Sequence, residues 1–303
     1  MDREFFNLFL DKTIFPDEAK ADLLRAFGIV QSNYGMEFLE LADCYKTQKF
    51  NADKVEEQIK SLADISAINE YTLWALLLIH TAKYTHRLYA EKGIGEDIFW
   101  DTFTDLRYKA IECKDVKGVW GIFVAKWYRK FFTCDIIKLG RLEYENNHYY
   151  YDAPYSFGDI ELFKSEDIAV KSVHIPGAPE PFDKEARLDS YRKAYEFFKE
   201  ELGGKPMICI CHSWLLFPEY KSILSPKSNI VSFMGDFDVF ASHEQENFED
   251  GWRVFADKSQ LPPKKLPENT SLQKAFKKHL IKGGKVGCGY GVLIFDGEKI
   301  INV

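Results

Sequence analysis

The sequence predicts an α+β protein in which an all-α domain, residues 1–132, is followed by a mixed α/β domain, residues 133–303. Two observations support this division. Apolar residues recur with a period of 3.6 up to about Phe131, and beyond Cys134 they alternate with a period of two. The chain has 303 residues, of which 46% are hydrophobic and 29% charged. It is therefore long enough for two domains and can bury a sizeable core.

The first half has the spacing of helices throughout. One helix is expected to begin at Pro16, with acidic residues in its first turn, and to end at Gly28. The longest, residues 68–91, is apolar nearly all round its middle, which is typical of a helix at the centre of its own bundle. The last, residues 120–131, keeps the spacing of an amphipathic helix.

The second half opens with strands. Residues 136–145 alternate in polarity, and Asn146-Asn147 predicts a tight turn that makes a hairpin. Residues 168–175 form a further expected strand. Asp183 is the expected N-cap of a helix of about twenty residues.

A short apolar strand is expected at residues 207–211, before a short helix at residues 217–224. Between them lie His212, Ser213 and Trp214, whose side chains carry polar groups. A buried strand that ends in polar groups beside a helix is a common place for a ligand in an α/β domain. The alternative is a core strand whose last residues cap the neighbouring helix.

Two more strands and one more helix complete the predicted domain. A long strand is expected at residues 229–240, and a glycine-interrupted strand at residues 285–295. Between them, Thr270 and Gln273 have the spacing of a capping box, in which each side chain pairs with the other residue's backbone amide.

Composition excludes several classes of partner. The net charge of −7 argues against a general nucleic-acid or anionic-membrane binder. The six cysteines are scattered without a CxxC pair, which is typical of reduced thiols in a cytoplasmic protein and predicts no metal site. The longest apolar run, residues 72–80, is far too short to span a membrane. We therefore expect a cytoplasmic protein that binds neither membranes nor nucleic acid.

The order of the expected elements, together with five motifs, resembles the bacterial two-domain acyltransferases that join an N-acyltransferase N-terminal helical domain to a GNAT-like C-terminal domain. The resemblance covers the second half motif by motif, and the first half as a helical domain of the right size. It implies a splayed central sheet, acyl-CoA (acetyl-CoA or longer) as co-substrate, and a small-molecule or peptide amine as acceptor. The motifs are Leu139–Glu145, Val173–Gly177, Cys211–Leu216, Ser228–Phe233 and Leu266–Gln273.

Acyl transfer of this kind sets structural requirements. The pantetheine arm needs a splayed strand pair in which it can hydrogen-bond as an added strand. A backbone N–H must hold the developing oxyanion, and a base and an acid must move the protons. Residues 207–211 and 229–240 are the expected splayed pair, and the backbone of residues 210–213 would serve the thioester carbonyl.

Four residues are candidates for catalysis. His212 could act as base or acid because imidazole titrates near neutral pH, or it could be a structural histidine bonded to backbone. Ser213 could donate to the thiolate, or merely cap the following helix. His174 could orient the substrate or be structural, and Glu143 could be a base or part of a solvated strand face.

The cofactor would lie against Cys211, Trp214 and Asn229 if the resemblance holds. One feature departs from the superfamily pattern, because the usual Arg/Gln-x-x-Gly-x-Gly/Ala turn that cradles the pyrophosphate does not follow residues 207–211. A substitute is the segment 264–285, which carries seven lysines and one acid.

Within this segment, Lys274, Lys278 and the free amides beginning at Thr270 suit an anion. The alternative is a solvated lysine face. Two functions follow: an acyl-CoA-dependent N-acyltransferase acting by direct attack, or a catalytically silent GNAT-like module that binds a small molecule or a protein. The oligomeric state stays undetermined.

Overall fold

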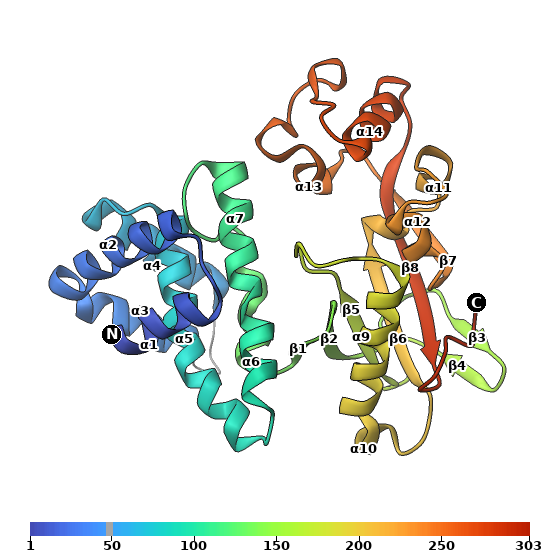
Figure 1. Ribbon diagram of the computed structural model, residues 1–303, viewed down its shortest axis with the longest axis horizontal. Coiled ribbons are helices and arrows are strands. Elements are labelled where there is room, and N and C mark those ends of the chain that lie inside the picture. The colour runs from blue at the N-terminus through green and yellow to red at the C-terminus, as the bar shows by residue number, and fades with distance from the viewer. Residues whose placement is uncertain (47–50) are drawn as a thin grey trace. The chain divides into compact units, whose positions relative to one another are not determined.

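The computed structural model describes residues 1–46 and 51–303, and the chain divides into two compact units, Met1–Ile137 and Lys138–Val303. A helical unit followed by a unit with a mixed sheet confirms the predicted fold class (Figure 1).

The first unit packs its helices around one core, and its central helix is α5. The buried positions of α5 run without a break from Thr72 to Ala82, as its apolar middle predicts. The described helices are α1 (Arg3–Lys12), α2 (Asp17–Asn33), α3 (Gly35–Lys46), α4 (Ala52–Ser66), α5 (Glu70–Glu91), α6 (Glu96–Phe103), α7 (Asp105–Lys117), η1 (Ala125–Tyr128) and α8 (Arg129–Phe132).

Two predicted helix boundaries in this unit are wrong. Helix α2 continues through Gly28 to Asn33, because an interior glycine costs only about 1 kcal/mol and the buried Val30 extends the apolar stripe. The expected helix 120–131 is helical only from Ala125 onward. A Cβ at Gly121 would lie 2.4 Å from the backbone of Tyr71, so this segment lies against α5 before the helix begins.

Among the described residues, no single helix is long and apolar enough to cross a membrane. The pair α4 and α5, bent by 117° where the two helices join, meets the length and composition criteria jointly.

The second unit is built on a six-stranded sheet with the order β1-β2-β5-β6-β8-β7. Strands β5 and β6 pair in parallel, whereas β2–β5, β6–β8 and β7–β8 pair antiparallel. The six strands are β1 (Ile136–Leu139), β2 (Leu142–His148), β5 (Ala169–His174), β6 (Met207–Ser213), β7 (Asp238–Gln245) and β8 (Val286–Phe295).

A separate hairpin and several short helices connect these strands. The hairpin consists of β3 (Tyr155–Phe157) and β4 (Ile160–Leu162). The helices are α9 (Lys184–Phe197), α10 (Lys199–Leu202), η2 (Trp214–Leu216), α11 (Tyr220–Ile223), α12 (Asn229–Met234), η3 (Glu249–Gly251), α13 (Trp252–Phe255), η4 (Ala256–Lys258), η5 (Pro263–Lys265) and α14 (Ser271–Ile281).

The first hairpin of the sheet turns at Gly140 and Arg141, so the predicted turn at Asn146-Asn147 is wrong. Gly140 has a φ of +73°, a conformation that glycine adopts without strain. Both asparagines lie inside β2, where they pair with β5.

Helix α9 covers one face of the sheet (Figure 1), and its predicted N-cap is confirmed. The Asp183 side chain accepts a hydrogen bond from the Ala186 amide. Ser190 fixes the helix to the β1–β2 turn, since its Oγ donates to the Leu139 carbonyl and accepts from the Leu142 amide, at 2.5 and 3.1 Å.

The predicted strand at residues 229–240 is wrong. Residues Asn229–Met234 form α12, which begins because the Ser228 side chain accepts from the Ile230 amide. Strand β7 starts only at Asp238. The β-branched pair Ile230-Val231 suggested a strand, but the serine N-cap and the buried Phe233 and Met234 stabilise a helix instead.

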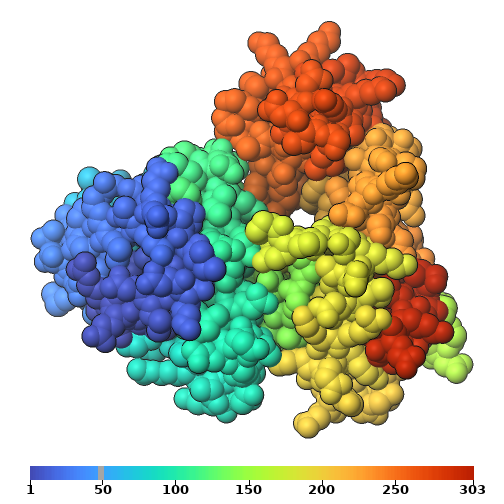
Figure 2. Space-filling model, viewed as in Figure 1, coloured from blue at the N-terminus to red at the C-terminus, as the bar shows by residue number. Residues whose placement is uncertain are grey.

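Helix α14 lies in a segment of the second unit that Figure 2 shows in orange-red as a distinct lobe. Its capping box between Thr270 and Gln273 is confirmed. An aromatic and aliphatic cluster holds the lobe on the unit, with the Phe276 ring of α14 4.8 Å from Tyr220, which in turn contacts Phe217.

Candidate functional site

The central feature of the sheet is the point where the two parallel strands β5 and β6 separate. They pair only at Lys171 with Cys209 and at Ser172 with Ile210. Strand β5 continues to His174 and β6 to Ser213 without further pairing to each other. Beyond the last pair, the facing backbone edges of the two strands are not paired with each other, and we call this separation of β5 from β6 the opening.

This opening corrects the predicted splayed pair. Strand β6 does not diverge from residues 229–240, because its full length pairs with β8, from Met207 with Phe295 to Ser213 with Gly289. The splayed partner of β6 is β5, a strand that the sequence predicted at residues 168–175 but did not place beside β6.

Two histidines flank the opening at matching positions. His174 lies two residues beyond Ser172 on β5, and His212 lies two residues beyond Ile210 on β6. Residues two apart on a strand share a face, so both histidines lie on the face opposite α9. Val170 and Ile210, on the same face, belong to one apolar cluster.

His174 is paired with a carboxylate. Its Nε2 lies 2.7 Å from Oε2 of Glu145 on the neighbouring strand β2, and the carboxylate is buried. Because an ionised carboxylate only accepts hydrogen bonds, Nε2 is the donor in this pair. Glu143 lies directly opposite His174 in the register and is buried, so it is not part of a solvated strand face.

His212 has a different environment. Its ring stacks on Tyr290 of β8 with centroids 4.3 Å apart and an interplanar angle of 4°, and the His243 ring of β7 lies 5.4 Å away. Desolvation, with a smaller contribution from His243, lowers the pKa of His212. The imidazole is thus held neutral beside two aromatic rings.

Ser213 and Trp214 have structural contacts. The Ser213 hydroxyl accepts from the Leu215 amide and caps η2, which agrees with the capping alternative. Trp214 is half-buried and its ring lies 5.8 Å from that of Phe276, so it joins the end of β6 to α14. Cys211 is buried on the face that α9 covers, and burial raises the pKa of its thiol.

A turn that binds the cofactor pyrophosphate is expected at the carboxyl end of β5. There, the helix that follows a parallel strand presents free backbone amides. The relevant loop is 175–183, which leads into α9, rather than the segment after β6. Arg141 donates to the carbonyls of Pro176 and Ala178 at 3.1 and 3.5 Å. The Asp183 carboxylate occupies the helix N-terminus itself.

A buried arginine fixes the far end of this loop. Arg187 donates to the Phe182 carbonyl at 2.9 Å and to both carboxylate oxygens of Asp236 at 2.5 and 3.3 Å. Tyr191 donates to the same carboxylate at 3.1 Å. The loop beside the opening is therefore held from both ends.

The other predicted cofactor-binding residues lie on helices. Asn229 is the exposed first residue of α12 rather than part of a strand. Thr270 has its side chain in the capping box, and Lys274 and Lys278 are exposed on α14. Lys277, in contrast, pairs with Glu268 at 3.2 Å.

Sequence reasoning missed two residues at the opening, Glu145 and Tyr150. Tyr150 follows β2, its ring lies edge-on to that of Tyr151 with centroids 4.8 Å apart, and desolvation raises the pKa of its hydroxyl. Glu145 follows Glu143 by two residues in the alternating strand, which is a signal that it faces the same side. Tyr150 had no comparable signal within its run of three tyrosines.

A cavity of about 470 Å³ lies elsewhere, between the end of β7 and the turn from α14 to β8. Residues 244–248 and 283–286 line it, with Leu280. None of the predicted site residues takes part.

Comparisons with protein families match both units. Residues 4–134 match the N-acyltransferase N-terminal domain, and residues 136–293 match the GNAT-like C-terminal domain. No curated protein sequence matches the chain.

Solved structures share the fold at low sequence identity. An acyltransferase in complex with decanoyl-CoA and teicoplanin is 18% identical with a TM-score of 0.74, covering 95% of this chain and 87% of its own. An acyltransferase mutant in complex with octanoyl-CoA is 18% identical with a TM-score of 0.73, covering 97% and 88%. An acyltransferase in complex with CoA and 10C-teicoplanin is 21% identical with a TM-score of 0.64, covering 77% and 69%.

Proposed function

Because the chain belongs to the family that joins an N-acyltransferase N-terminal domain to a GNAT-like C-terminal domain, we propose that it transfers an acyl group from acyl-CoA to an amine by direct attack on the thioester. The observation that carries this proposal is the separation of β5 and β6 after the single stretch Lys171–Ser172. It leaves two parallel backbone edges that a thioester arm can bridge.

The opening supplies what the thioester needs. The amide and carbonyl groups of the pantetheine arm can hydrogen-bond to a strand edge as an added strand does. A backbone N–H of residues 211–213 would then donate to the carbonyl oxygen as it becomes an oxyanion, where a fixed donor stabilises the transition state. The arm would lie between His174 and His212.

We assign the general base to His174. The Glu145 carboxylate orients the ring through the proton on Nε2 and stabilises the imidazolium. Nδ1 takes the proton from the attacking amine, directly or through a water. Nitrogen then bonds to the thioester carbon, and the carbon–sulfur bond breaks to release the CoA thiolate. Glu143, opposite His174 on β2, adds negative charge that favours a cationic amine in the acceptor position.

The leaving thiolate needs a proton. We assign this role to the Tyr150 hydroxyl, on the residue that lies just beyond β2. Ser213 is a weaker candidate because its hydroxyl already caps η2. His212 lies across the opening from His174, and we propose that it lines the acyl group's path.

The co-substrate and acceptor follow from the same site. Neighbouring folds hold CoA, octanoyl-CoA and decanoyl-CoA, and two of them hold a teicoplanin, which supports an acyl-CoA donor and a small-molecule amine acceptor here. Trp214 joins α14 to the end of β6, so the exposed Lys274 and Lys278 could meet the CoA phosphates. The free cysteines suit a reducing cytoplasm, where we place the reaction.

Thermal unfolding in the presence of acetyl-, octanoyl- and decanoyl-CoA tests the binding step. A ligand that binds only the native state raises its stability by about 2.7 kcal/mol at one hundred times its dissociation constant. Release of CoA thiol in the presence of small amines tests the chemical step. No stabilisation by any acyl-CoA would overturn the proposal.

A silent binding module is the second candidate. It is favoured by the N-terminus of α9, where the Asp183 carboxylate takes the place that a phosphate would occupy. The two functions separate in the same assays: the silent module would be stabilised by a ligand and release no thiol with any amine.

A further inference from the structure

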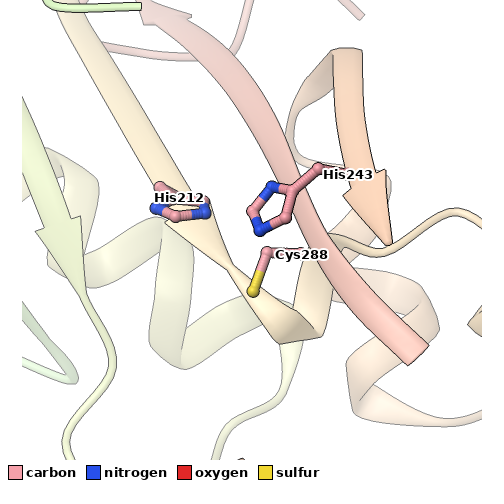
Figure 3. Close-up of side chains that lie close together, drawn as sticks. All are labelled: His212, His243 and Cys288. Atoms are coloured by element: carbon pink, nitrogen blue, oxygen red, sulfur yellow. The ribbon is translucent and has the colours of Figure 1, made fainter. Parts of the chain in front are cut away.

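Three potential metal ligands meet on the sheet face opposite α9, next to the opening. His212 comes from β6, His243 from β7 and Cys288 from β8, and one ligand atom from each lies within 4.8 Å of the other two (Figure 3). The register explains this meeting, because His243 pairs directly with Cys288, and His212 pairs with Tyr290, two residues further along β8.

These ligand types select a class of metal. Two imidazole nitrogens and a thiolate suit zinc and its neighbours in the first transition row, whereas calcium and magnesium require mainly oxygen ligands. Zinc bonds of about 2.0–2.3 Å in a tetrahedron put ligand atoms roughly 3.3–3.7 Å apart. Side-chain rotations of three neighbouring strands can close the remaining gap of about 1 Å.

The surroundings support a metal there. Both histidines are exposed while Cys288 is buried beneath them, so an ion can enter from solvent and reach a sulfur in the sheet. Tyr290 stacks on the His212 ring. Gln245 Nε2 lies 3.6 Å from the Cys288 sulfur, and such a donor to a ligand sulfur orients it and stabilises the thiolate.

We infer that His212, His243 and Cys288 form a binding site for a zinc-class divalent cation, with a fourth position open to solvent. Three protein ligands and an open position leave room for water or a second ligand. A bound ion would tie β6, β7 and β8 together at the side of the opening and hold His212 in one orientation. This inference concerns binding of the metal alone and does not depend on acyl transfer.

Cobalt(II) titration of the purified, tag-free full chain tests the site, because cobalt reports its ligands optically. We expect one equivalent to give tetrahedral d–d bands and a sulfur-to-cobalt charge-transfer band, both removed by added zinc and unaffected by excess magnesium. Cys288→Ser should lose the charge-transfer band, and His243→Gln should weaken cobalt binding at least tenfold.

Matched controls keep the result specific. Cys134→Ser removes another buried thiol, and His148→Gln removes an exposed histidine that pairs with Asp167 at 2.7 Å; both should titrate like the parent chain. If Cys288→Ser fails to fold, the surface variant His243→Gln carries the test. Absence of a sulfur band in the parent chain, or a band that survives both site variants, would overturn the inference.

Discussion

His174 and His212 occupy matching positions on two diverging strands, and the difference between them lies entirely in their neighbours. His174 meets a buried carboxylate, Glu145, at 2.7 Å. His212 meets an aromatic ring and a second histidine. A carboxylate stabilises the cationic imidazolium, whereas aromatic stacking and partial desolvation favour the neutral ring. The same side chain is thus suited to taking up a proton on one side of the opening and to binding a metal on the other.

The largest effect should come from removing the base. We expect His174→Gln to lower the rate of acyl transfer about 10²–10⁴-fold, the usual contribution of a positioned acid or base, with little change in acyl-CoA affinity. Steady-state release of CoA thiol measures this. The control is His148→Gln, which removes the other histidine–carboxylate pair of 2.7 Å from β2. If His148→Gln lowered the rate of acyl transfer as much as His174→Gln does, the loss would not be due to a base at position 174.

A third histidine, His80 in α5, extends the comparison to a buried ring whose Nε2 has no hydrogen-bond partner among the residues that the structure describes. Burial, with smaller contributions that include the Lys46 charge, lowers its pKa to about 4. The unfolded chain takes up the proton near pH 6.5 and the folded chain only near pH 4. The free energy of unfolding should therefore fall by about 3 kcal/mol as the pH drops through this window.

Urea unfolding at several pH values checks the His80 prediction. Subtracting the curve of His80→Leu from that of the parent chain isolates the contribution of this residue. The matched change at the partly exposed His86, His86→Leu, should leave the pH slope in place. The prediction would be contradicted if the free energy of unfolding had the same pH dependence in the parent chain and in His80→Leu.

A smaller effect is expected at Glu145. Glu145→Gln keeps the shape of the pair but removes the charge, and hydrogen bonds to charged groups contribute about 1 kcal/mol more than neutral ones. The rate of acyl transfer should fall about fivefold, and His174→Gln combined with Glu145→Gln should cost no more than His174→Gln alone. Additive losses in the double variant would show that the two residues act separately.

The smallest effect should come from the ring beneath His212. Tyr290→Leu removes a stacking contact of about 0.5–1.5 kcal/mol, so cobalt binding should weaken about threefold while the sulfur charge-transfer band persists. Competition with zinc in the optical titration measures this. A complete loss of binding would mean that Tyr290 holds the site together rather than orienting one ligand.

What the sequence predicted well was encoded locally. The N-cap at Asp183 and the capping box at Thr270 depend on residues within one helical turn, and both are confirmed. The two-domain family and the fold class are confirmed as well. The helix at residues 229–234 was missed because β-branched residues fit either state, and a serine N-cap decided between them.

What the sequence could not supply was the pairing of distant strands. The partner of β6 across the opening is β5, and the distance of His174 from Glu145 follows from the β2–β5 register. The cluster of His212, His243 and Cys288 likewise requires three strands in one order. A one-residue shift in any of these registers would turn the side chains to the other face.

Hydrogen–deuterium exchange of the backbone amides, with and without decanoyl-CoA, tests most directly whether the thioester arm lies between β5 and β6. The account predicts new protection at residues 173–175 and 211–213, where the facing strand edges would gain hydrogen bonds, and unchanged exchange at Met207–Ile210 and at their partners Val292–Phe295 on β8. Saturating ligand that leaves both edges exchanging as before, while protecting amides elsewhere, would contradict it.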